Sequence, residues 1–279
     1  MIRRDSPAKV NLILRVLGRR PDGYHDIESL MQKISLCDEL FFVATGNPGI
    51  RLRCRGLPLP EDENNIAHRA AATILSRLPR RTGVEITIQK KIPVAAGLGG
   101  GSSNAAVTLT ALNELFGLNL PREELMDIGK SLGADVPFFL YADAAWACGL
   151  GERLYPAKSL PKMWFVLVNP GFEVSTKSIY GKLNLGLTTG RRKDSIHRFD
   201  TVPELAGALW NDLEGVTLDL HPELRAVKDL LVNVGALGSL MSGSGPTLFG
   251  LFDSEEKAAM AEETLRQSTN HVIFRAHSI

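Results

Sequence analysis

The 279-residue sequence is poor in the features that mark several large classes of protein. Its three cysteines, Cys37, Cys54 and Cys148, are far apart and never form a CxxC pair. This spacing offers neither a zinc-ligand set nor a disulfide framework, so we expect buried or idle thiols in a reducing compartment. No apolar run approaches the ~20 residues that span a bilayer, and the formal net charge is only +1. These absences argue against a membrane protein and give no sign of a nucleic-acid partner.

Residues 1–14 carry charged side chains and continue directly into an alternating strand pattern. They lack the apolar core and the cleavage site of a secretory signal, so we expect a cytoplasmic protein. The chain is 44% hydrophobic and 23% charged, which is ordinary for a globular protein, and its length favours two domains. A shift to Pro, Lys and Ser after residue 155 places the expected domains at 1–158 and 159–279.

Strand and helix patterns alternate along the chain without an internal repeat, which predicts an α+β fold. Helices are expected over 65–78, 105–116, 121–132, 203–210, 222–232 and 254–267. Strands are expected over 34–44, 50–55, 84–89, 164–168, 247–252 and 271–276, and a polar loop over 188–200.

The most informative stretch is 93–103, which contains four glycines between the strand at 84–89 and the helix at 105–116. Glycines permit left-handed backbone and leave the main chain open to a ligand. A helix start presents free N–H groups and a positive partial charge, so its natural guest is an anion. We therefore predict a triphosphate-binding loop, in which the Ser-Ser-Asn at 102–104 caps the helix or offers a hydroxyl to a phosphate-bound metal.

Other interpretations of this loop fit less well. The Walker pattern needs a lysine after the glycines, whereas Lys90 and Lys91 precede them. The dinucleotide fingerprint GxGxxG fails at its third glycine, where Ser102 stands, which disfavours an oxidoreductase. A mobile linker would belong to a polar low-complexity stretch, but this loop adjoins its strand and helix directly.

Three further sites carry polar side chains whose spacing leaves two interpretations open. Lys9 and Asn11 share one strand face, which is either solvated or turned into a polar cavity, and spacing alone favours the solvated face. Asp135 precedes a short apolar stretch, and spacing alone favours a helix cap. Tyr24 and His25 follow a Pro-Asp-Gly turn, where they either pack internally or stack on a nucleobase.

Several stretches in this order resemble motifs of the GHMP small-molecule kinases. They are PAKVNLILRVLGRRPDGYH at 7–25, GLGGGSSNA at 97–105, GADVPFF at 133–139, NDLE at 211–214 and MSGSGPTLFGLF at 241–252. The run of three glycines and the DGYH sequence are closest to members that phosphorylate a CDP-linked alcohol of the non-mevalonate isoprenoid route. The resemblance implies a two-domain fold, in which the N-terminal domain at 1–158 binds ATP and the C-terminal domain at 159–279 lies on the substrate side, with the active site in the interdomain cleft. It also implies transfer of the ATP γ-phosphate to a hydroxyl.

The resemblance also implies a role for each matching residue. Lys9 and Asp135 match the catalytic pair, and Asn11, Tyr24 and His25 match substrate-binding positions. Tyr180 matches more loosely, as the aromatic side chain on the other side of the cytosine base. The implied ATP-binding residues are Pro93, Val94, Ala95, Ala96, Gly97, Leu98, Gly99, Gly100, Gly101, Ser102 and Ser103.

The implied ligands are ATP as co-substrate, Mg²⁺ bound with it, and a small-molecule substrate that carries a CDP group. No motif fixes the metal ligands, and the chain is expected to be a monomer or a weak homodimer. Two rivals remain: a GHMP kinase for another alcohol, such as homoserine or mevalonate, and a nucleotide sensor without catalysis. DGYH opposes the first rival, and the presence of Lys9 and Asp135 opposes the second.

Overall fold

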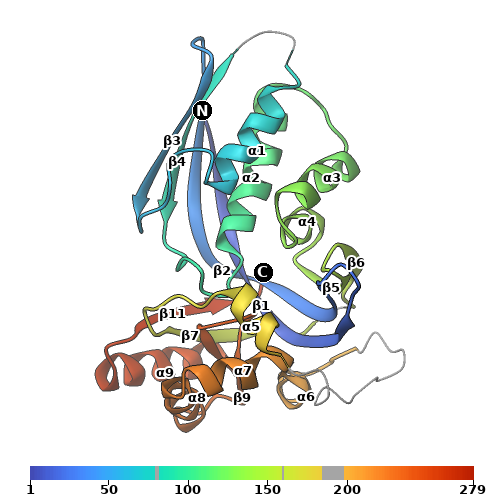
Figure 1. The fold of residues 1–279 in the computed structure, drawn as a ribbon. Helices are drawn as coiled ribbons and strands as arrows, with labels where there is room; N and C mark the ends of the chain where they lie inside the picture. Colours follow the sequence, from blue (N-terminus) through green and yellow to red (C-terminus); the bar gives the residue numbers. More distant parts are fainter. Residues whose placement is uncertain (79–81, 159, 184–197) are drawn as a thin grey trace. The chain divides into compact units, whose positions relative to one another are not determined.

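The computed structural model describes residues 1–78, 82–158, 160–183 and 198–279 (Figure 1). The elements are β1 Ile2–Arg19, β2 His25–Thr45, β3 Gly49–Gly56, α1 Ile66–Leu75, β4 Gly83–Lys90, α2 Gly100–Leu115, α3 Arg122–Leu132, α4 Val136–Tyr141, β5 Ala144–Gly149, β6 Arg153–Pro156, β7 Trp164–Asn169, α5 Thr176–Lys182, α6 Val202–Ala208, β8 Trp210–Asn211, α7 Asp212–Leu220, α8 Glu223–Asn233, β9 Gly238–Met241, β10 Leu248–Phe252, α9 Glu255–Ser268 and β11 Val272–His277. The fold is therefore α+β, as predicted, and most of the predicted loop at 188–200 lies outside the described residues. Within the described ranges, none of the helices has the length and apolarity needed to span a bilayer.

The described chain divides into two compact units, and both are discontinuous in sequence. Unit 1 contains residues 1–8, 37–94 and 99–142, and unit 2 contains residues 9–36, 95–98 and 143–279. Strands β1 and β2 therefore each give one end to either unit. The predicted boundary between residues 158 and 159 separates an ATP-binding domain from a substrate-side domain. This division by ligand stays a prediction.

Unit 1 combines part of a sheet with four helices. Strand β2 pairs antiparallel with β4, and β4 pairs parallel with the edge strand β3. Val84, Ile86 and Ile88 of β4 are buried, in the alternation that predicted this strand. Helix α1 starts at Asn65, whose side chain accepts a hydrogen bond from the Ala67 amide, as predicted. Helix α2 packs against α1, α3 and α4, and the four helices lie on one side of the strands (Figure 1).

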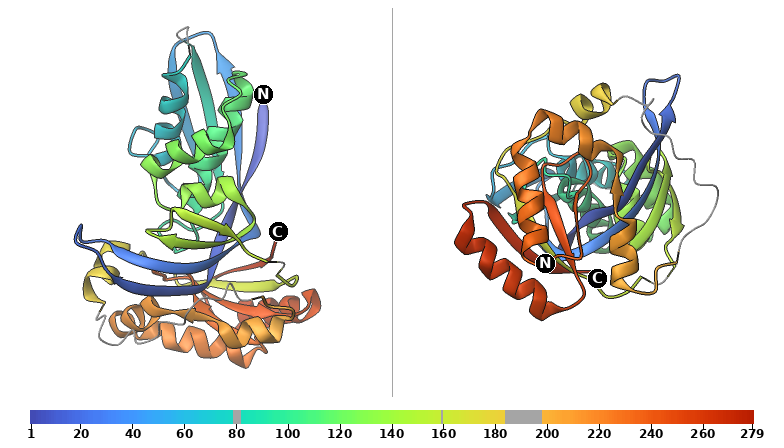
Figure 2. Two further views of the ribbon diagram at one scale, coloured as in Figure 1. Left: turned by 90° about the vertical axis from the view of Figure 1, so that its right-hand side faces the viewer. Right: turned by 90° about the horizontal axis from the view of Figure 1, so that it is seen from below.

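Unit 2 contains a second sheet with the strand order β11-β7-β10-β9, in which all pairs are antiparallel. Val166 of β7 and Phe252 of β10 belong to a buried cluster that also takes Leu213, Leu231 and Leu265 from helices α7, α8 and α9. Figure 2 shows these helices, coloured orange to red, lying across the strands that they neighbour in sequence. In the same unit, β5 pairs with β2 and β6, and β1 pairs in parallel with the short β8.

The predicted helices and strands are present, and the differences have identifiable causes. Strand β2 begins nine residues before the predicted start because Ile27 to Gln32 pair with β5, a contact that local sequence cannot reveal. Helix α7 was not predicted, since Gly215 and the β-branched Val216 and Thr217 give it a weak intrinsic propensity. It is held instead by its cap, Asn211, and by tertiary contacts.

Candidate active site

The predicted phosphate loop leaves the end of β4 and bends through left-handed residues before α2. Gly97 and Gly99 have φ values of 77° and 69°, and the exposed Ala95 has φ 49°. A Cβ on Gly97 would lie 2.0 Å from the Ser242 carbonyl oxygen, so only glycine fits there. A left-handed alanine is uncommon and is retained only where its surroundings impose it. The segment is thus a shaped turn and not a linker.

The expectation that one of residues 102–104 caps helix α2 is wrong. The helix begins earlier, at Gly100, with Gly99 in the N-cap position and no side-chain cap hydrogen bond. The Ser103 amide already donates to the Gly99 carbonyl, at 2.9 Å, as part of the helical turn. Because no described side chain caps α2, the N–H groups of its first turn are left for water or an anion.

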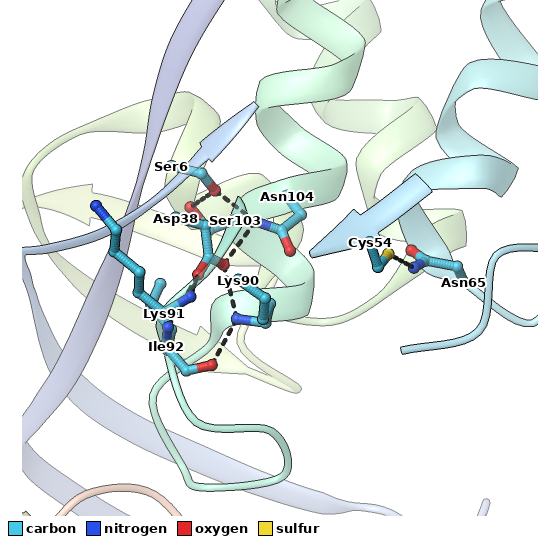
Figure 3. Close-up of polar contacts among 9 residues, drawn as sticks. All are labelled: Ser6, Asp38, Cys54, Asn65, Lys90, Lys91, Ile92, Ser103 and Asn104. Carbon is cyan, nitrogen blue, oxygen red and sulfur yellow. Dashed lines mark hydrogen bonds and ion pairs between the residues drawn. The ribbon is translucent and has the colours of Figure 1, made fainter. Parts of the chain in front are cut away.

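A buried carboxylate, Asp38 of β2, holds the entrance to the loop (Figure 3). Its Oδ2 accepts from Lys90 Nζ at 2.6 Å and from Asn104 Nδ2 at 2.9 Å. Its Oδ1 accepts from the Lys91 and Ile92 amides at 2.8 and 2.9 Å. Hydrogen bonds to a buried charge are strong, so Asp38 ties the end of β4 to the first turns of α2. Burial lowers the pKa of the Lys90 ammonium, and Asp38 opposes that shift.

The two serines of the first turn have different surroundings. Ser103 is fully buried, and Ser6 Oγ donates to its hydroxyl at 2.8 Å (Figure 3). Asn104 is buried as well, and it donates to Ser6 Oγ at 2.9 Å. Ser102 is partly exposed. Of the two hydroxyls expected to serve ATP or a metal, only that of Ser102 therefore reaches the surface of this turn.

Lys9 and Asn11 lie side by side on β1 and are only 4% and 3% exposed, so the solvated face favoured by spacing alone is wrong. Lys9 Nζ donates to Asn11 Oδ1 at 2.5 Å, and Asn11 Nδ2 donates to Ser29 Oγ at 2.8 Å. Ser29 in turn donates to the Ile13 carbonyl at 2.8 Å. This chain of donors turns the amide oxygen of Asn11 toward the ammonium. The Lys9 backbone amide donates to the Leu98 carbonyl at 2.9 Å, which joins β1 to the glycine loop.

The turn after β9, in the motif at 241–252, contacts both of these segments. Ser242 Oγ donates to the Gly97 carbonyl at 2.9 Å and accepts from the Asn11 amide at 3.3 Å. A Cβ on Gly243 would lie 3.2 Å from the Gly97 carbonyl oxygen and 3.5 Å from Asn11 Oδ1. Within unit 2, three motifs that are far apart in sequence therefore meet backbone to backbone.

Asp135 occupies the N-cap position of α4, but its side chain makes no cap hydrogen bond, so the capping role favoured by spacing alone is wrong. The helix behind it is anchored by the buried Val136, against which Gly129 of α3 packs so closely that a Cβ would lie 2.9 Å from Val136 Cγ1. A Cβ on Gly133 would lie 3.8 Å from Ser102 Oγ. The segment that carries Asp135 thus passes beside the first turn of α2.

His25 and Tyr180 are brought together in unit 2. Their ring centroids are 5.2 Å apart and their planes are inclined by 30°, which is a stacked arrangement. Burial, with a smaller effect from Arg19, lowers the pKa of the His25 imidazole and so favours the neutral ring at pH 7. The Tyr24 side chain is 65% exposed. The structure therefore places His25 on the face of Tyr180 and leaves Tyr24 open to solvent.

The thiols match the expectation of idle cysteines: all three are free, and burial raises the pKa of Cys37 and of Cys54 to about 11. Among the residues that the structure describes, no three His, Cys, Asp or Glu side chains are grouped so as to hold a metal. A metal in this site would therefore be held largely by phosphate oxygens and water, with few protein ligands. The uncapped start of α2 and its partly exposed hydroxyl fit the phosphates of ATP.

Sequence reasoning missed Asp38, Lys90 and Ser242. A signal for the first two was present, because a period of two places Asp38 on the face of Ile34 and Leu40, and Lys90 on the buried face of β4. Two opposite charges on inward faces of strands predict a buried pair. No local signal identified Ser242, whose role depends on contacts with residues more than 140 positions away.

Comparisons with known proteins identify the family of the chain. The model of the N-terminal domain of GHMP kinases matches residues 65–143, and that of their C-terminal domain matches residues 192–271. The chain is 59% identical over 274 residues to the 4-diphosphocytidyl-2-C-methyl-D-erythritol kinase of Syntrophus aciditrophicus. The match covers 98% of this chain and 98% of that one. It is 50% identical to the enzyme of the same name from Geobacter sulfurreducens, over 94% of this chain and 93% of that one.

Among solved structures, a crystal structure of 4-(cytidine 5'-diphospho)-2C-methyl-D-erythritol kinase matches with a TM-score of 0.81 and 37% identity, over 99% of both chains. The mevalonate kinase of Methanococcus jannaschii matches with a TM-score of 0.75 and 16% identity, over 100% of this chain and 98% of that one. At that identity the second likeness concerns the fold alone.

Proposed function

The chain belongs to the GHMP kinase family of ATP-dependent small-molecule kinases, and from that premise we propose that it phosphorylates the 2-hydroxyl of 4-diphosphocytidyl-2-C-methyl-D-erythritol. The observation that carries the proposal is the 59% identity, over 98% of both chains, to a kinase named for that substrate. The reaction would serve isoprenoid precursor synthesis by the non-mevalonate route.

ATP would bind through the loop at 93–103 and the N-terminus of α2. The left-handed glycines expose main-chain N–H groups, and the uncapped first turn adds its own donors and a positive partial charge. Mg²⁺, bound with ATP, would neutralise charge that develops on the phosphates, with Ser102 as the hydroxyl best placed in the first turn. Fixed donors of this kind stabilise the transition state without reorganising during the reaction.

Lys9 and Asp135 would perform the transfer itself. Asp135 would accept the proton of the attacking hydroxyl while that oxygen bonds to the γ-phosphorus, the bond from phosphorus to the bridging oxygen breaks, and ADP leaves. Lys9, whose ammonium is already directed by Asn11, would balance the negative charge on the reacting groups. The mechanism requires that the side chains of Lys9 and Asp135 come together around the two substrates.

The cytosine of the substrate would be recognised by Tyr24, His25 and Tyr180. A neutral imidazole both donates and accepts a hydrogen bond, which suits the edge of a nucleobase. Aromatic rings supply stacking faces, and the His25–Tyr180 pair already has a stacked geometry. A cytoplasmic location and a monomer or weak homodimer remain predictions of the sequence.

A coupled assay of ADP release tests the function. We expect turnover with the cytidylated methylerythritol and ATP, and none with homoserine or mevalonate at equal concentration. Phosphorus NMR of the product should show a new phosphate monoester beside an intact diphosphate bridge. Preferred turnover of homoserine or mevalonate would refute the proposal.

A further inference from the structure

The NDLE motif at 211–214 has no part in the proposed chemistry. It nevertheless forms hydrogen bonds with the turn around Ser242, which contacts the glycine loop. Asn211 is only 8% exposed, and it is both the last residue of β8 and the N-cap of α7. Its Nδ2 donates to the Met241 carbonyl and to the Gly243 carbonyl, both at 2.7 Å. Its Oδ1 accepts from the Leu213 amide at 2.9 Å, which caps α7 and fixes the orientation of the amide. Both N–H donors are therefore committed to the carbonyls that flank Ser242.

Helix α7 reinforces this grip. Glu214 Oε1 accepts from the Met241 amide at 2.9 Å, and its Oε2 pairs with Lys228 Nζ at 2.5 Å. Thr217 Oγ1 donates to the Ser244 carbonyl at 3.3 Å. Four hydrogen bonds from one short segment thus fix the backbone from residue 241 to residue 244.

That backbone has little freedom to move against the glycine loop. Ser242 is fully buried. Its hydroxyl donates to the Gly97 carbonyl and accepts from the backbone amide of Asn11. Gly97 and Gly243 approach so closely that a Cβ on either would press on the other segment. A displacement of the turn would therefore move Gly97, and with it Leu98, which accepts from the Lys9 amide.

We infer that Asn211 is a positioning residue for phosphoryl transfer. It fixes the position of the Ser242 turn, and through that turn it aligns Gly97 and the Lys9–Asn11 pair. The inference rests on the proposed kinase function. Small errors of alignment are expensive in such reactions, where a shift of about 1 Å can lower the rate about 100-fold.

The test is Asn211→Asp, which keeps the size and the capping oxygen but turns an acceptor toward two carbonyl oxygens. The matched control is Asn113→Asp, since Asn113 likewise donates to one carbonyl, that of Leu120, and accepts from the same residue's amide. We expect kcat per folded molecule to fall between about 10- and 100-fold in Asn211→Asp. The KM values for both substrates should change less than threefold, and the control should retain wild-type kcat. The variant Ser242→Ala should lower kcat similarly, and the double variant should be no worse than either single one, because both act through one turn.

Equal kcat per folded molecule in Asn211→Asp and wild type, or additive losses in the double variant, would overturn the inference. Hydrogen exchange provides a readout that does not depend on catalysis. Amides of 95–98 and 241–245 should exchange faster in Asn211→Asp and not in Asn113→Asp, and unchanged exchange would also overturn it. If the wild type fails to turn over the cytidylated substrate, the proposed function is wrong. The exchange comparison alone then decides whether Asn211 positions the Ser242 turn and the glycine loop.

Discussion

At position 9 an ammonium group lies in the protein interior with an amide oxygen as its hydrogen-bond partner. Removing a charge from water is costly, so a buried lysine needs nearby groups that stabilise its charged form. Asn11 supplies one, and its own orientation is fixed by Ser29. Hydrogen bonds within the protein thus orient the side chains of Lys9 and Asn11 before any ligand binds.

The role of Asp135 is tested by Asp135→Asn. We expect kcat to fall at least about 100-fold, because the amide cannot accept the proton of the attacking hydroxyl. A non-hydrolysable ATP analogue should still bind with near wild-type affinity in calorimetry. The control is Asp127→Asn, which removes an exposed α3 carboxylate that accepts from Lys130 Nζ at 2.8 Å. Near-normal kcat in Asp135→Asn would remove the residue from the mechanism.

Base stacking is tested by Tyr24→Ala. Stacking on an aromatic side chain contributes about 1–3 kcal/mol per base, so the KM for the cytidylated substrate should rise by about 5- to 150-fold. The KM for ATP should stay within about twofold. Tyr155→Ala, which removes another exposed tyrosine, serves as the control. If both KM values rise equally, Tyr24 lies outside the base pocket.

His25 gives the site a pH dependence whose sign can be stated. Its pKa is below the ordinary 6.5, so the neutral ring persists as pH falls through that value. The KM for the cytidylated substrate should stay level from pH 8 to about 6.5 and rise only at lower pH, as the acceptor nitrogen becomes protonated. His25→Gln should lose this rise. A rise that begins between pH 8 and 7 would contradict the lowered pKa.

At the scale of elements, the glycine loop takes its shape from its neighbours. Strand β4, the loop and helix α2 were predictable because each has a local pattern: alternation, glycines and helical spacing. The start of α2 was not, since the competing signal of Ser102 to Asn104 as caps was outweighed by the burial of Ser103 and Asn104 against β1 and β2. Asp38 holds Asn104 in this buried position, much as Asn211 holds the Ser242 turn.

Asp38→Asn tests how much the loop entrance depends on the buried charge. It leaves Lys90 buried without a counter-charge, and breaking such a pair lowers the free energy of unfolding by about 3–5 kcal/mol. Asp38→Asn with Lys90→Met should recover much of that loss, because no buried charge remains. Urea denaturation measures both. Glu85→Gln, which removes the exposed partner of Arg51, should change stability by less than about 1 kcal/mol. A loss that small in Asp38→Asn would contradict the proposed importance of the pair.

At the scale of the whole molecule, the sequence predicted two domains that follow one another along the chain, 1–158 and 159–279. Local composition changes after residue 155, but it cannot show that β1 and β2 give one end to each unit. The function was accessible from sequence because five stretches resemble, in the same order, motifs of one kinase family. The contacts that join three of those motifs in unit 2 were not, since they depend on backbone approach at Gly97 and Gly243.

A fragment that ends at residue 158 tests what this interleaving means for folding. Leu14 and Val16 of β1 are buried in the same cluster as Val166 and Phe252, which the fragment lacks. Exposing such a cluster removes most of its hydrophobic stabilisation, about 25 cal/mol for each Å² of apolar surface. We therefore expect the fragment alone to lack dispersed amide signals in NMR and to bind no ATP analogue, whereas co-expression with residues 159–279 should restore a soluble, active complex. A folded fragment that binds the analogue by itself would instead establish 1–158 as an autonomous ATP-binding domain.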